Sequence, residues 1–190
     1  MSSILTGLNN WAFHIVLYFA NPALNSFMSL MGTSFFVVLP LLALYLYLKK
    51  DKNVFSFVFG MVLIFLITEI IKDIIKEPRP CSVADLQWIN HVGCEASYSF
   101  PSNHATVLTG LLFFLNKYKY VRALYGIWVI LILVGRVYLG AHYLTDVIVG
   151  IVISIIFYYI ILSKKDKINS FFAKIFARVA KPLCPDEFLR

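Results

Sequence analysis

Three short clusters of polar residues, spread over positions 72–146, hold the residue types that phosphate chemistry requires. The first has two cations before a proline, the second is a Pro-Ser-Asn-His tetrapeptide, and the third combines a cation, a histidine and an aspartate. Their members are Lys72, Arg79 and Pro80; Pro101, Ser102, Asn103 and His104; and Arg136, His142 and Asp146. Each cluster stands at the edge of a strongly apolar segment. If the fold brings these edges together, the clusters form one anion site.

The first cluster predicts a cationic clamp at the end of a helix. Lys72 and Arg79 are seven residues apart, which is two helical turns. Pro78 and Pro80 end that helix, because proline lacks a backbone N–H and disfavours helix in the residue before it. An ammonium and a guanidinium fork can together neutralise a dianionic phosphate. Taken alone, such a pair is more often two cations that reach from a helix end to the membrane surface.

The tetrapeptide 101–104 lies where a loop enters a helix. Ser102 or Asn103 is a good N-cap, and the free amides and positive dipole of a helix N-terminus attract an anion. His104, in the first turn, can protonate a leaving oxygen. On its own, the tetrapeptide is more typical of a plain cap followed by a packing histidine.

The third cluster pairs a histidine with a carboxylate. His142 and Asp146 are four residues apart at the start of an apolar segment, so they share one helical face. A carboxylate that holds one ring nitrogen fixes the tautomer and raises the basicity of the other, which suits a nucleophile. Arg136, at the end of the preceding segment, can add a second guanidinium fork. A capping aspartate beside a satisfied histidine would show the same spacing.

The composition indicates that these clusters belong to a membrane protein. The 190 residues are 60% hydrophobic and 14% charged, whereas soluble domains carry about 25% charge. Long apolar runs alternate with short charged loops. The net charge of +7 favours anionic lipid over nucleic acid as a partner. We expect a single domain over 1–190, with an N-terminal segment 1–23, a five-span core 24–162 and a basic tail 163–190. No cleavable signal peptide is expected, since Lys49 is the first basic residue.

The predicted fold class is all-α, a polytopic membrane helix bundle with five clear transmembrane helices. These spans are expected near 24–48, 54–75, 102–115, 121–139 and 143–162. Pro40 is expected to kink the first span. Residues 4–20 fit either a short sixth span or a helix at the interface, and 168–181 predicts a basic amphipathic helix on the inner leaflet.

The positive charges predict the orientation of the bundle. Thirteen of the 17 Lys and Arg residues fall at one end of the predicted spans, which the positive-inside rule assigns to the cytoplasm. The other four are Lys72, Lys76, Arg79 and Arg136, and three of these belong to the clusters. Cations that oppose the orientation rule need a reason, and an anionic ligand supplies one.

The three clusters, taken in order, resemble the tripartite signature of the type 2 phosphatidic acid phosphatase superfamily: Lys72-x6-Arg79-Pro80, Pro101-Ser102-Asn103-His104 and Arg136-x5-His142-x3-Asp146. That family includes bacterial lipid phosphatases, glucose-6-phosphatase and the vanadium haloperoxidases. The resemblance implies that His142 is the nucleophile that forms a phosphohistidine, that Asp146 orients it, and that His104 is the acid for the leaving group. It further implies that phosphate is held by Lys72, Arg79, Ser102, the Asn103 amide and Arg136.

Two positions depart from the family pattern. Asn103 stands where the family usually has Gly, and Asn tolerates unusual backbone angles better than most residues. Gly135 stands where the family usually has Ser before the third-cluster arginine, so one hydrogen bond to phosphate is missing or supplied elsewhere. Neither departure touches the implied nucleophile, its orienter or the acid, so activity is expected to survive.

The resemblance implies a membrane lipid phosphatase that needs no metal or other cofactor. It would act on a phosphate monoester or pyrophosphate of a membrane lipid. Candidate substrates are phosphatidylglycerol phosphate, phosphatidic acid, undecaprenyl pyrophosphate and lipid A 1-phosphate. The expected location is the bacterial cytoplasmic (inner) membrane, with several spans and with the site facing the periplasm. The sequence leaves the particular lipid and the oligomeric state open.

The sequence leaves three other functions open. A metal-dependent membrane hydrolase would use His104, His142, Asp146 and Glu69 as ligands, although three cations at the same place would repel the metal. A non-catalytic lipid or phosphate transporter would also span the membrane, but the chain shows no internal repeat or pair of broken helices. A vanadium haloperoxidase shares the signature, but five spans argue against a soluble oxidase.

The cysteines leave a further question open. Cys81 and Cys94 flank the loop 81–100, and a disulfide between them is expected if the outer compartment is oxidising. Two free thiols fit almost as well. Cys184, on the predicted cytoplasmic side, is expected to stay free.

Overall fold

The computed structural model describes residues 3–83, 94–179 and 188. Within these residues the chain is built of helices joined by short connections, without a strand. The helices are α1 (Ser3–Phe19), α2 (Pro22–Thr33), α3 (Phe35–Leu48), α4 (Asn53–Ile75), α5 (Pro80–Val83), α6 (Asn103–Leu111), α7 (Lys119–Tyr138), α8 (Leu144–Ser163) and α9 (Lys165–Val179). The expectation for Cys184 lies outside the described residues.

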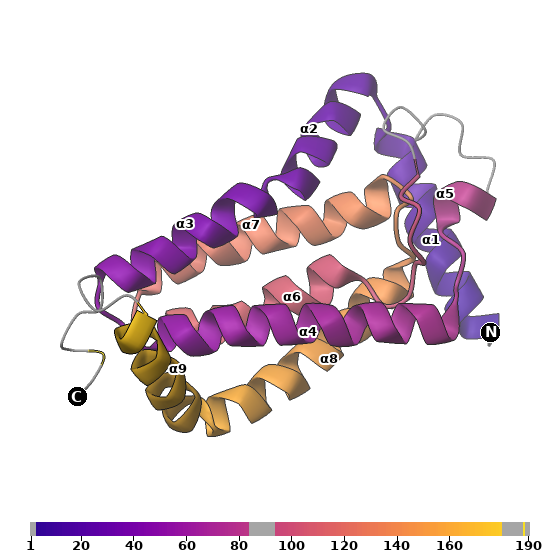
Figure 1. Ribbon diagram of the computed structural model, residues 1–190. Coiled ribbons are helices and arrows are strands. Elements are labelled where there is room, and N and C mark those ends of the chain that lie inside the picture. Colours follow the sequence, from indigo (N-terminus) through magenta and orange to yellow (C-terminus); the bar gives the residue numbers. More distant parts are fainter. Residues whose placement is uncertain (1–2, 84–93, 180–187, 189–190) are drawn as a thin grey trace.

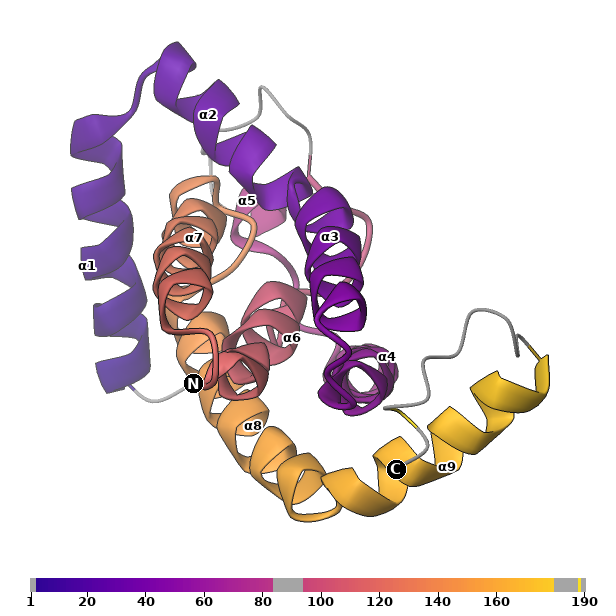
Figure 2. The same ribbon diagram turned by 90° about the vertical axis from the view of Figure 1, so that its left-hand side faces the viewer.

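Helices α3, α4, α7 and α8 run lengthwise through the bundle, and α6 lies among them (Figures 1 and 2). Helix α1 runs across this direction at the end where α7 stops and α8 starts, and α9 lies across the opposite end (Figure 1). Asn9, a buried polar residue of α1, docks this helix there: Asn9 Oδ1 accepts from Thr145 N at 3.2 Å. The crosswise course of α1 fits a helix at the interface better than a sixth span.

The structure confirms an all-helical, multi-pass membrane protein and revises the number of long spans. In the part of the chain that is described, α4, α7 and α8 are each long and apolar enough to cross a bilayer, and α2 with α3 can form a fourth span. The expected third span is α6, which has nine residues followed by a 3₁₀ turn of four. It can be this short because protein surrounds it, with Ala105, Leu108, Leu111 and Leu115 almost fully buried.

The first span breaks at Ser34, and α3 continues as one helix through Pro40, where the kink was expected. Helices α2 and α3 meet at Ser34 with an angle of 41°. The Ser34 hydroxyl donates to a backbone carbonyl three residues earlier at 2.6 Å and accepts from Trp128 Nε1 at 2.9 Å. The hydroxyl therefore competes with the helical pattern and ties the break to α7. Gly32 leaves room beside this break, since a Cβ there would lie 3.1 Å from Arg136 Nη1.

Two glycines allow α6 and α8 to pack closely. A Cβ on Gly110 would overlap the ring of Tyr158. A Cβ on Gly150 would lie 2.7 Å from the Cβ of Ala105 and 3.2 Å from the Ser102 carbonyl oxygen. Small residues at a helix contact let two backbones approach in this way. The contact fixes the first turn of α6 against the first turns of α8.

The positive charges are divided between the two ends of the bundle in the predicted manner. The α3–α4 connection, the start of α7 and the α8–α9 connection, which carry most of the lysines, lie at one end (Figure 1). The four cations that oppose the orientation rule lie at the other end, in the last turn of α4, in the connection after it and in the last turn of α7. Lys181 and Arg190 lie outside the described residues.

Helix α9 has the amphipathic character that the sequence predicts. Phe172 packs on Phe59 of α4 with ring centroids 5.3 Å apart, and Phe176 packs on Phe55 at 6.1 Å. Phe171 and other apolar residues on the outer side stay exposed. A helix that packs against the bundle and also exposes apolar rings suits a position at the membrane surface.

Candidate active site

The structure brings the three clusters together from six short segments of the chain. The first cluster comes from the last turn of α4 and the connection that follows it, and the second opens α6. The third comes from the end of α7, the loop after it and the first turn of α8. Backbone bonds join these parts: Ser102 N donates to the Asp146 carbonyl at 3.3 Å, and Cys81 N donates to the Gly140 carbonyl at 2.9 Å.

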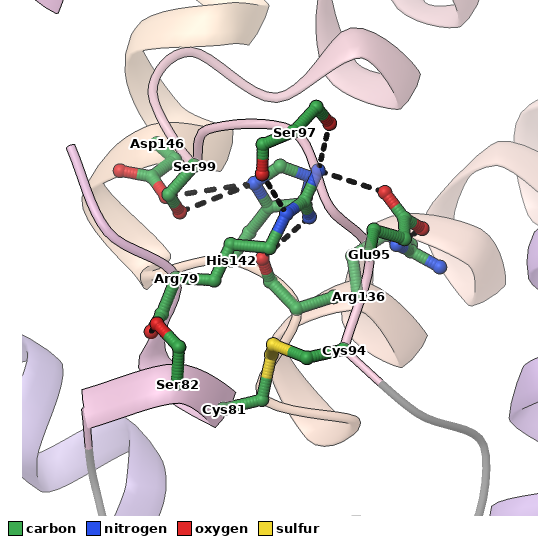
Figure 3. The surroundings of a disulfide bond; sticks show 11 residues. Arg79, Cys81, Ser82, Cys94, Glu95, Ser97, Ser99, Arg136, His142 and Asp146 are labelled. Atoms are coloured by element: carbon green, nitrogen blue, oxygen red, sulfur yellow. Dashed lines mark hydrogen bonds and ion pairs between the residues drawn. A yellow bond between two sulfur atoms is a disulfide. The ribbon is translucent and has the colours of Figure 1, made fainter. Parts of the chain in front are cut away.

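His142 is held from the Nδ1 side of its ring (Figure 3). Asp146 Oδ2 lies 3.5 Å from His142 Nδ1. The Ser99 hydroxyl also lies 3.5 Å from this nitrogen and donates to the same carboxylate oxygen. Asp146 Oδ2 further accepts from Tyr143 N at 2.9 Å and so caps α8. The aspartate therefore serves both as helix cap and as neighbour of the histidine, the two alternatives that its spacing allowed.

The other ring nitrogen of His142 faces cations. His142 Nε2 lies 3.4 Å from Arg79 Nη1. Burial first, and then the charges of Arg79 and Arg136, lower the pKa of His142 well below its ordinary range. The ring is therefore neutral near pH 7. A neutral imidazole that keeps a lone pair on Nε2 is the form that a nucleophile requires.

Arg79 is almost fully buried and its guanidinium is fixed from several directions. Nε donates to the Ser97 carbonyl at 2.6 Å, Nη2 donates to the Ser97 hydroxyl at 2.8 Å, and Nη1 donates to the Ala141 carbonyl at 2.8 Å. Nη2 also lies 2.7 Å from Glu95 Oε2. The loop that follows Cys94 thus sets the direction of this fork.

Glu95 joins Arg79 to Arg136. Its second oxygen, Oε1, accepts from Arg136 Nη2. Burial alone would raise the pKa of Glu95, but the guanidinium groups of Arg136 and Arg79 hold this pKa below its usual range. A charged carboxylate therefore lies between the two arginines. Arg136 Nε is buried and has no hydrogen-bond partner among the described residues.

Lys72 and Ser102 are buried close to this centre, and Asn103 is partly buried beside them. Lys72 Nζ donates to the Tyr98 carbonyl at 2.6 Å and is not among the residues that line the cavity described below. Ser102 is fully buried, and its hydroxyl has no partner in the described part of the chain. Asn103 Nδ2 donates to Glu69 Oε1 at 2.6 Å.

His104 lies on the wall that α2 and α3 share. Its Nε2 is 3.1 Å from the Gly32 carbonyl oxygen. Since a carbonyl oxygen only accepts, this bond requires the proton on Nε2. The ring packs edge-on against Phe35, with centroids 5.0 Å apart. The imidazole is thus held against α2 and α3 by one hydrogen bond and one ring contact.

A cavity of about 510 Å³ connects these groups with an apolar passage. Its polar end is lined by Arg79, Glu95, Asn103, His104, Arg136 and His142. Its walls come from α3, α4 and α6, and Phe36, Val62 and Phe65 on these walls are partly open on the outside of the bundle. The cavity therefore joins a cationic end to a hydrocarbon-like surface between α3 and α4.

Three side chains of the site were missed by sequence reasoning, and all lie between the first and second clusters: Glu95, Ser97 and Ser99. A usable signal existed for the first, because Glu95 follows Cys94. The structure joins Cys94 to Cys81 in a disulfide, with Cα atoms 5.9 Å apart, and Cys81 is two residues from Arg79 (Figure 3). The serines had no comparable signal, since serine is common in any polar loop.

Comparison with known proteins identifies the family. The model of the PAP2 superfamily matches residues 53–170, more than half of the chain. The chain therefore belongs to the PAP2 superfamily, the family whose signature the three clusters resemble.

The individual relatives share less than a third of their aligned residues with this chain. Phosphatidylglycerophosphatase B of Bacillus subtilis is 31% identical over 127 residues, which cover 58% of this chain and 59% of that protein. The match therefore spans less than two thirds of that relative. An undecaprenyl-diphosphatase of Sulfolobus acidocaldarius is 27% identical over 150 residues, covering 76% of this chain and 72% of that protein. The crystal structure of a transmembrane PAP2 type phosphatidylglycerolphosphate phosphatase from Bacillus subtilis has the same fold, with a TM-score of 0.67, 23% identity, and coverage of 87% and 88% of the two chains.

Proposed function

We propose that this protein is an integral membrane lipid phosphatase that hydrolyses a phosphate monoester or pyrophosphate through a phosphohistidine at His142. The cavity is the observation that carries the proposal. It presents His142 and two guanidinium groups at one end and apolar walls along α3 and α4. Cations suit a headgroup phosphate, and apolar walls suit the chains of the same lipid. Membership of the PAP2 superfamily and the names of the two relatives support the same chemistry.

In the first step, His142 Nε2 attacks phosphorus in line with the lipid oxygen. The N–P bond forms while the P–O bond to the lipid breaks. His104 enters this step doubly protonated, gives its Nδ1 proton to the departing oxygen and keeps the Nε2 proton on the Gly32 carbonyl. The imidazole gains positive charge in this step. Asp146, with Ser99 bonded to the same oxygen, stabilises that charge from the Nδ1 side.

In the second step, water attacks the phosphohistidine. The N–P bond breaks, and the water proton passes to the His104 that lost its proton in the first step. Inorganic phosphate leaves, and both histidines return to their starting forms. The reaction therefore consumes one water for each phosphate released.

The positive charge that stabilises the equatorial oxygens comes from the protein in this proposal. Arg79 and Arg136 line the cavity and can each bind phosphate with a planar fork. Ser102 Oγ and Arg136 Nε, which have no partner among the described residues, are further donors for phosphate oxygens. Lys72 adds charge from behind the loop, because its Nζ is bonded to the Tyr98 carbonyl. We therefore propose a metal-independent reaction.

The site would face the periplasm from the bacterial cytoplasmic membrane. The end of the bundle opposite the site carries most of the lysines, which the positive-inside rule assigns to the cytoplasm. The substrate would then be a lipid phosphate of the outer leaflet, and it would enter between α3 and α4. Phosphatidylglycerol phosphate, phosphatidic acid, undecaprenyl pyrophosphate and lipid A 1-phosphate are the candidates.

Phosphate release by the purified full-length protein tests this function on those four lipids. We expect release from at least one lipid to persist in excess EDTA, to fall with vanadate and to vanish in His142→Ala. The matched control is His14→Ala, which removes an exposed histidine of α1. Complete loss with EDTA would instead support the metal-dependent hydrolase. Release that is unchanged in His142→Ala would refute the catalytic role and leave the transporter.

A further inference from the structure

We propose that Glu95 is an internal competitor for phosphate. Its carboxylate bridges Arg79 and Arg136 in the resting protein, and the substrate phosphate must displace it to reach both arginines. This inference rests on the proposed function in one respect, since it takes the two arginines as the phosphate ligands. It adds a residue that sets the affinity of the site for its substrate.

The geometry of the bridge is that of a bound oxyanion. One Glu95 oxygen lies 2.7 Å from Arg79 Nη2, and the other accepts from Arg136 Nη2. Guanidinium forks bind carboxylate and phosphate through the same N–H groups. Glu95 also lines the same end of the cavity as His142. A phosphate held by both arginines next to His142 Nε2 would therefore need the position that the carboxylate occupies.

The exposures of the three side chains show which partner can move. The arginine side chains are 3% and 9% exposed, whereas that of Glu95 is 49% exposed. Arg79 also donates to the Ser97 and Ala141 carbonyls, and these bonds do not involve Glu95. Arg79 is thus held by bonds to other residues and Arg136 by its burial, whereas the half-exposed carboxylate can exchange its bonds with them for bonds with water.

The disulfide holds this competitor near the site. Cys94 precedes Glu95 and is bonded to Cys81, whose backbone N–H is in turn bonded to the Gly140 carbonyl at 2.9 Å. A short covalent tether raises the effective concentration of a group at its target. The bond therefore favours the state in which Glu95 bridges the arginines.

A purely structural role for Glu95 predicts the opposite sign. If the carboxylate served to position the arginines, its removal would leave them less ordered, and phosphate would bind more weakly. If the carboxylate competes, its removal exposes two organised guanidinium groups, and phosphate binds more tightly. The sign of the change separates the two roles.

Calorimetric titration of inorganic phosphate into the purified full-length protein measures that sign. We expect Glu95→Gln to bind phosphate about tenfold more tightly, as for a site that is closed about nine-tenths of the time. Asp73→Asn, which removes an exposed carboxylate at the same end of the bundle, should stay within about twofold of the wild type. Unchanged or weaker binding by Glu95→Gln would overturn the proposal. Because this titration needs no hydrolysis, its outcome is separate from a failure to release phosphate from any lipid.

A double-mutant cycle tests the tether. The pair Cys81→Ser and Cys94→Ser should tighten phosphate binding about threefold in the wild-type background and leave it unchanged in Glu95→Gln. That dependence on Glu95 is what a general effect on folding would not produce. Equal changes in both backgrounds, or weaker binding in the first, would refute the role of the disulfide.

Discussion

The two ends of the bundle hold the same kinds of charged residue in opposite surroundings. At the site, Lys72, Arg79 and Arg136 are 1%, 3% and 7% exposed. At the other end, Lys117, Arg122 and most of their neighbours lie on the surface. Helix α7 connects the two situations, because it begins next to exposed cations and ends with a buried one (Figure 1).

The cations at the two ends are stabilised in different ways. Water solvates the charges at the exposed end, and each exposed pair contributes little to stability. A buried charge is costly unless the protein supplies partners. At the site these partners are the Tyr98 carbonyl for Lys72, the Ser97 and Ala141 carbonyls for Arg79 and the Glu95 carboxylate for Arg136. Buried cations that already have partners in the protein are expected where the protein also binds an anionic ligand.

The largest effect that separates the two ends should appear within α7. Arg136→Gln removes a guanidinium from the proposed phosphate site, and we expect kcat/KM to fall by about 100-fold or more. Arg122→Gln removes the same charge from the exposed end of the helix and should change kcat/KM by less than about twofold. Phosphate release under first-order conditions measures both. Similar losses in the two variants would mean that the burial of Arg136 has no functional meaning.

The residues that meet at the site could be predicted where residue type and spacing limit the possibilities. His142 and Asp146 share a helical face at the start of a span, and Lys72, Arg79 and Arg136 stand out because they oppose the charge pattern of the chain. Apolar runs likewise predicted α4, α7 and α8 within a few residues. These features depend on local periodicity and on a charge rule that acts over the whole chain.

The parts that could not be predicted depend on contacts between segments distant in sequence. Glu95 and Ser99 lie in a loop without periodicity, and only the fold places them against α7 and α8. The position of the bend is a second example. Pro40 satisfies a local rule for a kink, but Ser34 and its bond with Trp128 determine where the span breaks. Polar groups inside a membrane protein find partners on other helices, which one segment does not reveal.

A smaller effect should distinguish two serines at the two ends of the bundle. Ser99 donates to the carboxylate of Asp146 beside His142, so Ser99→Ala should lower kcat about tenfold while KM stays nearly constant. Ser163, at the far end of α8, donates to a backbone carbonyl and is exposed, so Ser163→Ala should leave both constants unchanged. Steady-state kinetics in lipid micelles provide the test. A rise in KM without a fall in kcat would assign Ser99 to substrate binding and not to positioning.

The smallest expected effect concerns the acid limb of the pH profile. The proposed nucleophile is the neutral form of His142. Burial and the charges of Arg79 and Arg136 lower the pKa of this residue well below its ordinary value of about 6.5. A lowered pKa keeps the ring unprotonated as the pH falls, so the enzyme should retain its reactive form below pH 6.5. Arg79→Gln removes one of the charges that oppose protonation, so the pKa of His142 should rise and the acid limb of kcat/KM should move to higher pH.

Lys117→Gln, at the exposed end, is the control and should leave the acid limb in place. The substrate phosphate titrates identically in all three proteins, so a difference between their pH profiles comes from groups of the protein. An acid limb that stays fixed in Arg79→Gln would show that the buried cations do not act on the nucleophile.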